Sequence, residues 1–227
     1  MTLTDRKLIV VLGIDGSGKS TVSAEVIRIL REHHGVRAAL CWARWQPRVV
    51  GFVRRLVLLR FTRAVPFAPG KEEPKKVSQL KASVFGRWRL LGLMYLLMAL
   101  GEYWLQYWGT IRRLNRTADL VLLDRYWYDV VIDAVGNDPT REYEAARLVR
   151  GWYRRMFPRP TQVILLDVDE SIARQRKGGE NPIDYLVTRR RIYRLVVESL
   201  GGTVIDASRP VDEVIANVLT QISRDAM

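Results

Sequence analysis

The sequence predicts an α/β fold in which one parallel sheet of five strands is covered by helices on both faces. Short apolar segments alternate along the chain with longer stretches of helical periodicity. A glycine-rich loop directly follows the first apolar segment. Such alternation is typical of right-handed βαβ units, in which helices bury both faces of the strands. The predicted strands are Lys7–Leu12, Arg37–Trp42, Asp119–Leu123, Gln162–Leu166 and Thr203–Ile205.

Helices are expected between all of these strands. The helix after the glycine loop is predicted over Lys19–Arg31, where Val22, Val26 and Leu30 recur at helical spacing. The other predicted helical stretches are roughly 78–115, 140–156, 183–199 and 210–224.

The long second helix contains a largely apolar, uncharged run from Leu90 to Gly101, which Glu102 interrupts. A membrane-spanning helix needs about 20 apolar residues, and this run is shorter. We therefore expect a long, mostly buried helix beside the sheet.

The composition is that of one globular domain, residues 1–227. Hydrophobic residues make up 48% and charged residues 27% of the chain, which suits an extensive core and argues against disorder. The single cysteine, Cys41, cannot form an internal disulfide. No signal peptide precedes the first strand, so a cytoplasmic protein is expected.

The net charge of +13 favours anionic partners such as nucleotides, nucleic acid or anionic lipid. Because the arginines are scattered over predicted helices, a solvated basic surface is favoured over a nucleic-acid groove, and no specific nucleic acid is expected. The basic, apolar segment 54–63 keeps peripheral membrane contact as a minority interpretation. A homodimer is left open.

The loop after the first strand matches the Walker A pattern, Gly13-x-x-x-x-Gly18-Lys19-Ser20. Its glycines allow successive N–H groups to point at phosphate oxygens, and the following helix adds its positive end. Lys19 is expected to reach the β- and γ-phosphates of a nucleoside triphosphate such as ATP, and Ser20 to ligate Mg²⁺. The predicted nucleotide-binding residues are Gly13, Asp15, Gly16, Ser17, Gly18, Lys19, Ser20 and Thr21.

Asp124, Arg125 and Tyr126 stand at the end of the third strand, at the sheet edge where ligands bind in open α/β folds. A carboxylate there can hold Mg²⁺ through water, so Ser20 and Asp124 are the predicted metal residues. The guanidinium of Arg125 can grip the phosphate of an acceptor with two hydrogen bonds.

Cations flanked by glycines follow the fourth strand. Arg174, Arg176 and Lys177 precede Gly178 and Gly179, a pattern that suits a small mobile lid around 174–186. The phosphoryl group in transfer needs nearby positive charge, and these three side chains are candidate catalytic cations beside Lys19, Asp124 and Arg125.

Taken together, these blocks resemble the thymidylate kinases. The similar blocks are the Walker A loop, Leu-Leu-Asp124-Arg125-Tyr126, the stretch ending in Asp167-Val-Asp169 with Arg174 after it, and Ile205-Asp206-Ala207. The resemblance implies a P-loop kinase fold of the nucleoside monophosphate kinase type. It also implies transfer of the γ-phosphoryl group of ATP to a nucleoside monophosphate, with dTMP as first choice.

The resemblance also implies roles on the acceptor side. Asp15 matches the loop carboxylate near the acceptor sugar, and Gly16 in place of arginine resembles members whose catalytic cation comes from the lid. Arg44 falls in the block after the second strand, and Tyr103 near the position of a base-contacting arginine. The predicted acceptor-binding residues are Asp15, Arg44, Tyr103, Arg125 and Tyr126.

The acceptor blocks depart from the family pattern, so other interpretations stay open. Trp104, Trp127 and Tyr128 are candidates for stacking on a base. The aromatic, apolar stretch from Tyr95 to Trp108 favours, as the alternative, a kinase of a non-nucleotide acceptor such as a glycan or lipid intermediate. A second alternative is a regulatory protein that binds ATP.

Overall fold

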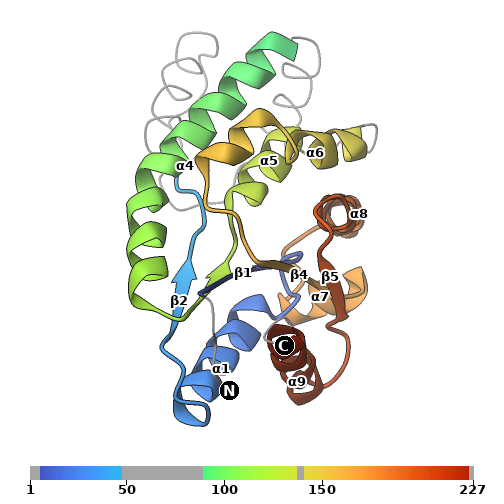
Figure 1. Cartoon of the computed structure of the whole chain (residues 1–227). Coiled ribbons are helices and arrows are strands. Elements are labelled where there is room, and N and C mark those ends of the chain that lie inside the picture. The colour runs from blue at the N-terminus through green and yellow to red at the C-terminus, as the bar shows by residue number, and fades with distance from the viewer. Residues whose placement is uncertain (1–5, 48–88, 137–140, 225–227) are drawn as a thin grey trace.

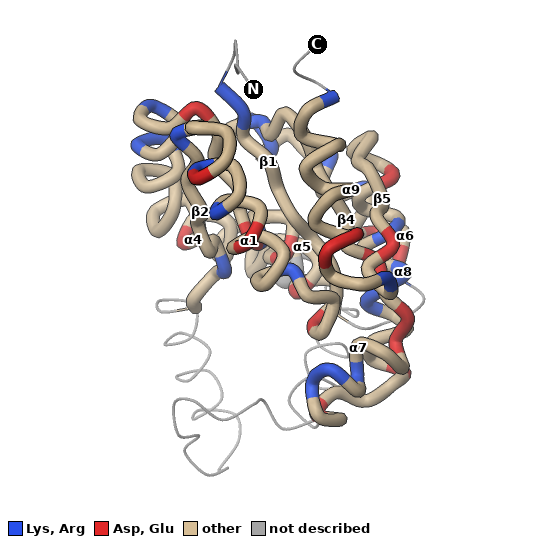
Figure 2. The backbone as a smooth tube through the Cα atoms, turned by 90° about the horizontal axis from the view of Figure 1, so that it is seen from below, with Lys and Arg blue, Asp and Glu red and all other residues tan. Residues whose placement is uncertain are grey.

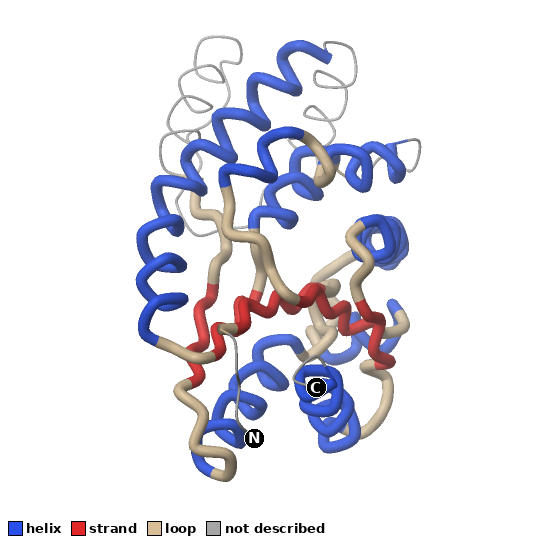
Figure 3. The backbone as a smooth tube through the Cα atoms, in the orientation of Figure 1, coloured by secondary structure: helices blue, strands red, loops and turns tan. Residues whose placement is uncertain are grey.

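The computed structural model describes residues 6–47, 89–136 and 141–224. All five strands are parallel and form one sheet in the order β2-β3-β1-β4-β5 (Figure 3). The predicted α/β class, with its five-stranded parallel sheet, is confirmed. The strands are β1 (Lys7–Leu12), β2 (Ala38–Trp42), β3 (Leu120–Asp124), β4 (Gln162–Asp167) and β5 (Thr203–Asp206).

Helices cover both faces of this sheet, as Figure 1 shows: α1 and α9 lie below it, and α4, α5 and α8 lie above. The helices are α1 (Lys19–Glu32), α4 (Arg89–Thr117), α5 (Trp127–Val135), α6 (Glu142–Leu148), α7 (Glu170–Arg176), α8 (Ile183–Ser199) and α9 (Val211–Arg224), with a 3₁₀ helix η2 at Trp152–Met156. Burial of both faces explains why β1, β3 and β4 consist almost entirely of apolar residues.

The register of the strands brings the chemically interesting segments to one edge. Val11 of β1 lies beside Asp124 of β3, and Asp167 of β4 lies beside Asp206 of β5. The glycine loop follows β1 directly, so it lies at the same edge as Asp124. This is the carboxyl edge of a parallel sheet, where ligands bind in open α/β folds.

Two helices were not predicted, and a third prediction was partly wrong. In α5, nearly every residue is buried, so the sequence lacks the polar face that produces helical periodicity. The short helix α7 occupies part of the predicted lid. The stretch 140–156 is not one helix, because α6 ends before Gly151, whose extended backbone (φ −61°, ψ 169°) separates it from η2.

Helix α4 confirms the long helix beside the sheet, and its predicted first part, 78–88, lies outside the described residues. Tyr103, Leu100 and Ile111 of α4 are buried against the core. Within the described ranges no helix is long and apolar enough to cross a membrane. The segment 54–63, on which the membrane interpretation depended, also lies outside the described residues.

Basic side chains do not gather in one patch of the part that the structure describes. Figure 2 shows Lys and Arg spread over several helices and strands, with Asp and Glu among them. Several of these charges form surface ion pairs, for example Arg28 with Glu25 and Glu32. Such an arrangement fits a solvated basic surface.

Asp167, at the end of β4, ties the sheet to α8. Its carboxylate accepts hydrogen bonds from Arg190 Nε at 2.7 Å and Nη2 at 2.8 Å, and from Arg194 Nη2 at 2.7 Å. Burial raises the pKa of Asp167, but the two arginines outweigh this effect and hold the pKa below its ordinary value of 3.8.

The substitution Asp167→Asn is expected to destabilise the protein by about 1–2 kcal/mol at neutral pH, since two charge-assisted contacts are lost while both arginines stay partly hydrated. A lowered carboxylate pKa stabilises the fold above the unfolded pKa, and this stabilisation is lost as the pH falls through the folded value. The difference in unfolding free energy between parent and variant should therefore shrink below about pH 4. Urea unfolding of parent and variant across a pH series measures this difference. A difference that does not change with pH would contradict the stabilising role of the Asp167 carboxylate.

Candidate active site

The glycine loop forms a tight turn between β1 and α1. Gly13, Gly16 and Gly18 have φ values of 152°, 91° and 83°, which residues with side chains rarely adopt. At Gly16 a side chain would also meet the backbone of Ala173 in α7, so the loop and α7 are in direct contact. The predicted start of the helix at Lys19 is confirmed.

Lys19 lies inside this loop, with its side chain buried. Its Nζ donates hydrogen bonds to the carbonyl oxygens of Gly13 at 2.8 Å and Ile14 at 2.7 Å. Burial, and then the positive charge of Arg125, lower the pKa of Lys19 to about 8. The ammonium therefore lies at the centre of the loop. With this pKa it stays mostly protonated at neutral pH, but by a smaller margin than an ordinary lysine does.

Ser20 and Asp124 meet at the sheet edge beside the loop. Ser20 Oγ donates a hydrogen bond of 2.6 Å to Oδ2 of Asp124. Asp124 is 3% exposed, and its other oxygen, Oδ1, has no hydrogen-bond partner among the described residues. Since buried polar atoms are nearly always paired, a free carboxylate oxygen next to a serine hydroxyl fits a hard cation such as Mg²⁺ with its water.

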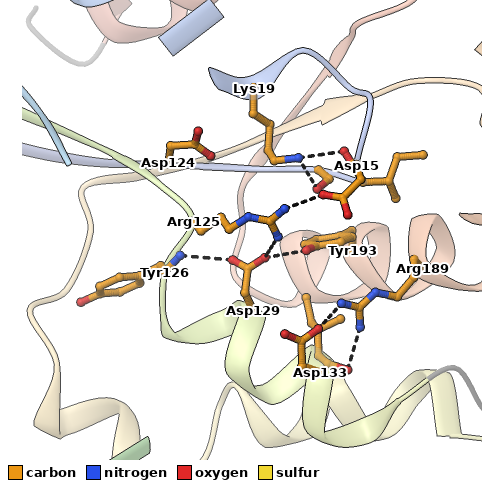
Figure 4. Close-up of polar contacts among 12 residues, drawn as sticks. Asp15, Lys19, Asp124, Arg125, Tyr126, Asp129, Asp133, Arg189 and Tyr193 are labelled. Atoms are coloured by element: carbon orange, nitrogen blue, oxygen red, sulfur yellow. Dashed lines mark hydrogen bonds and ion pairs between the residues drawn. The ribbon is translucent and has the colours of Figure 1, made fainter. Parts of the chain in front are cut away.

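Arg125 is held between two carboxylates, one on each side (Figure 4). Its Nη2 lies 2.5 Å from Asp15 Oδ1, and its Nη1 lies 3.0 Å from Asp129 Oδ1. Burial lowers the pKa of Arg125, but Asp129, Tyr193 and Asp15 more than compensate, so the pKa is raised. For Asp15, burial raises the pKa, and the cations Arg125 and Lys19 lower it below its ordinary value.

The backbone of Arg125 is unusual. With φ of 76°, it is the only residue other than glycine in the described ranges with a positive φ. Such a conformation costs of order 1–3 kcal/mol and persists only where the surroundings hold it. Here the backbone N–H of Arg125 donates to Val11 in β1, and the guanidinium is fixed by its two carboxylates.

Asp129 is a site residue that sequence reasoning missed. It stands at the third position of α5, where its carboxylate accepts from the backbone N–H of Tyr126 at 3.1 Å and also reaches Arg125. The available signal was an acid four residues after Arg125, at a helix start that had not been predicted.

Among the predicted acceptor residues, Arg44 and Asp15 lie near each other. Arg44 is exposed, and its charge contributes to the lowered pKa of Asp15, after burial and the charges of Arg125 and Lys19. The carbonyl oxygen of Arg44 accepts a hydrogen bond of 2.5 Å from Tyr107 of α4, so the segment after β2 is fixed against the long helix.

Tyr103 and Tyr126 lie in the core instead of facing the loop. Both rings are fully buried and 6.2 Å apart, and Tyr126 donates to the carbonyl of Pro158. The expectation that Trp127 and Tyr128 stack on a base was wrong, because both side chains are buried in the aromatic cluster around Phe157. Their apolar surroundings explain why these aromatics belong to the core.

The three candidate lid cations lie on and just after α7. Arg174 and Arg176 are in its last turn, so the start of the predicted lid is helical. Arg176 donates to the carbonyl of Ala207, and Lys177 is exposed at the helix end. An open groove of about 460 Å³ lies beside them, lined by Ser171, Arg174, Gln175, Gly178, Gly179 and Ile183.

The architecture and the site together define a class. A glycine loop between the first strand and a helix, with a serine–aspartate pair at the same edge of a five-stranded parallel sheet, is the arrangement of a P-loop kinase fold.

Comparison with known proteins narrows this class. No protein-family model matches the chain. A probable thymidylate kinase of Archaeoglobus fulgidus is 34% identical over 101 residues, 41% of this chain and 48% of that protein. One of Pyrobaculum aerophilum is 41% identical over 75 residues, 30% of this chain and 39% of that protein. These two matches span less than half of the relatives' own length.

A third relative, probable thymidylate kinase 1 of Saccharolobus solfataricus, is 26% identical over 228 residues, which cover 97% of this chain and 98% of that protein. The resemblance to thymidylate kinases predicted from the sequence is confirmed by these three relatives, to which the chain is similar.

Proposed function

We propose that this chain transfers the γ-phosphoryl group of ATP, bound with Mg²⁺, to a nucleoside monophosphate, and that dTMP is the first acceptor to test. The observation that carries the proposal is the meeting of Lys19, Ser20, Asp124 and Arg125 at one sheet edge. The names of the three relatives, all probable thymidylate kinases, support the choice of acceptor.

On the donor side, the loop N–H groups and the start of α1 offer positive dipoles to the triphosphate. Lys19 Nζ can exchange the carbonyls of Gly13 and Ile14 for phosphate oxygens, whose charge stabilises the ammonium. Ser20 and Asp124 would hold Mg²⁺, which neutralises charge on the β- and γ-phosphates when bound.

On the acceptor side, Arg125 is the group that faces the phosphate. Each terminal nitrogen of its guanidinium carries two N–H groups and uses one for a carboxylate, so donors remain for phosphate oxygens. Arg44 supplies a second cation near Asp15. Residues 1–227 act as one domain in this proposal, and the segment 174–186, with Arg174, is its lid.

The test is a panel of nucleoside monophosphates incubated with ATP and Mg²⁺, with ADP formation as the readout. Phosphorylation of dTMP or another pyrimidine monophosphate, dependent on both ATP and the acceptor, is the expected result. Transfer to no nucleotide would contradict the proposal.

A second candidate is the same donor site acting on a non-nucleotide acceptor such as a glycan or lipid intermediate. The observation in its favour is the burial of Tyr103, Trp127 and Tyr128 in the core. These three side chains were expected to contact a nucleotide base, and in the core they cannot reach one. A protein that only binds ATP is less well supported, because Arg125, beside the predicted metal residues Ser20 and Asp124, is a cation suited to a second phosphate, which sensing alone does not require.

The preference for dTMP over dUMP is expected to be about tenfold or less. Strong discrimination depends on buried polar groups that only one substrate satisfies, and such groups can give factors of about 10⁴–10⁵. Tyr103, which by the resemblance falls near the position of a base-contacting arginine, lies in the core. The ratio of kcat/KM for the two acceptors measures this preference, and a value above a thousandfold would contradict it.

A further inference from the structure

A buried carboxylate connects the acceptor-side arginine with the helix that follows the lid. Asp129, in the first turn of α5, is 4% exposed and accepts three hydrogen bonds. Arg125 Nη1 lies 3.0 Å and the Tyr193 hydroxyl 2.5 Å from Oδ1, while the Tyr126 N–H lies 3.1 Å from Oδ2. Figure 4 shows that Arg125, just before α5, and Tyr193, on α8, both reach this carboxylate.

The guanidinium of Arg125 stands between two unequal carboxylates. The side chain of Asp15, on the loop side, is 36% exposed, whereas Asp129 is buried and fixed by its other two donors. Without Asp129, the attraction of Asp15 would draw the guanidinium toward the loop.

We propose that Asp129 is a positioning residue for Arg125 and that the hydrogen bond from Tyr193 holds the Asp129 carboxylate in place. Helix α8 thereby fixes the direction in which Arg125 faces the acceptor phosphate. The inference rests on the proposed function and adds to it the residues that set the acceptor geometry. Asp129 itself is too buried to reach a substrate, and it acts through Arg125.

An ion pair also joins α5 and α8 and supplies a matched control. Arg189 of α8 pairs with Asp133, one turn after Asp129 on α5, and also donates to the carbonyl of Ile132 at 3.0 Å. Within the described ranges Asp133 forms no hydrogen bond or ion pair with Arg125 or the loop, and its charge raises the pKa of Arg125 less than Asp129, Tyr193 or Asp15 does. Both aspartates therefore hold α5 against α8, but only Asp129 touches the arginine of the site.

The experiment compares Asp129→Asn, Tyr193→Phe and Asp133→Asn. An asparagine cannot satisfy Tyr126 on one side and both Arg125 and Tyr193 on the other, and it carries no charge. We expect Asp129→Asn to raise the acceptor KM about tenfold or more, with the Kd for ATP within twofold of the parent. Tyr193→Phe should raise the acceptor KM about threefold, because the carboxylate stays in place but loses one donor.

Asp133→Asn should lower the melting temperature while leaving the acceptor KM within twofold of the parent. A double-mutant cycle completes the test: in an Arg125→Ala background, Asp129→Asn should cause no further loss of kcat/KM, since it acts through the missing arginine.

Equal losses in both backgrounds, or an equal rise of the acceptor KM in Asp133→Asn, would overturn the inference and show a purely structural role. If Asp129→Asn does not fold, Tyr193→Phe decides, and an unchanged acceptor KM in that variant overturns the inference. A parent protein that phosphorylates no nucleoside monophosphate overturns the proposed function first, and the inference with it.

Discussion

Replacing Lys19 by alanine is expected to lower kcat by about 10²–10³, the usual cost of losing a preorganised charge contact to the reacting group. Lys19 is the ammonium inside the loop, held there by the carbonyls of Gly13 and Ile14. The rest of the loop would keep its fold, because the glycines and not the lysine set its backbone. Steady-state kinetics with saturating ATP measure the effect, and turnover within threefold of the parent would rule out the assignment of the loop.

Lys7 provides the control for this substitution. It is another buried lysine, on β1, and its Nζ donates to the carbonyl of Ile222 in α9 at 2.9 Å, away from the carboxyl edge. Lys7→Ala should lower the melting temperature and leave kcat within twofold of the parent. A comparable loss of turnover in both variants would indicate general destabilisation and not a role in transfer.

The substitution Arg125→Lys should lower kcat/KM for the acceptor by about 10- to 100-fold, while the Kd for ATP stays nearly unchanged. An ammonium cannot span Asp15 and Asp129 and still donate two parallel bonds to a phosphate, as the planar guanidinium can. The expected factor corresponds to the loss of one or two charged hydrogen bonds. Acceptor titrations by steady-state kinetics, with ATP binding by calorimetry, separate the two effects.

The same exchange at Arg37 serves as its control. Arg37 forms a two-point ion pair with Asp119, with Nη2 at 2.6 Å and Nε at 3.0 Å, on an exposed side chain. Arg37→Lys should leave all kinetic constants within twofold of the parent. Should Arg125→Lys weaken ATP binding and spare the acceptor kinetics, Arg125 would belong to the donor side.

The geometry of the candidate donor half could be predicted because its signals are local. Glycine spacing, a preceding apolar strand and a following helix lie within about 25 residues, and backbone geometry dictates each of them. The strand ends carrying Asp124 and Asp167 were equally predictable, since the carboxyl ends of parallel strands share an edge.

The surroundings of the candidate acceptor residues could not be predicted, because they depend on packing between distant segments. The burial of Tyr103 results from contacts with Tyr126 and Phe157, which lie far away in the sequence. Asp129 acquires its role only when α5, a helix without a polar face, brings it to Arg125 and to Tyr193, 64 residues later. Periodicity does not report on such contacts.

The close approach of Gly16 to the backbone of Ala173 limits which side chains can be introduced into the glycine loop. The space above Gly16 belongs to α7, so an arginine introduced at position 16 would displace the helix that carries Arg174. An arginine at position 16 and Arg174 in its present place on α7 therefore exclude one another in this protein. Moving the charge from one to the other requires two coordinated changes, a longer side chain at Gly16 and a shorter or shifted α7.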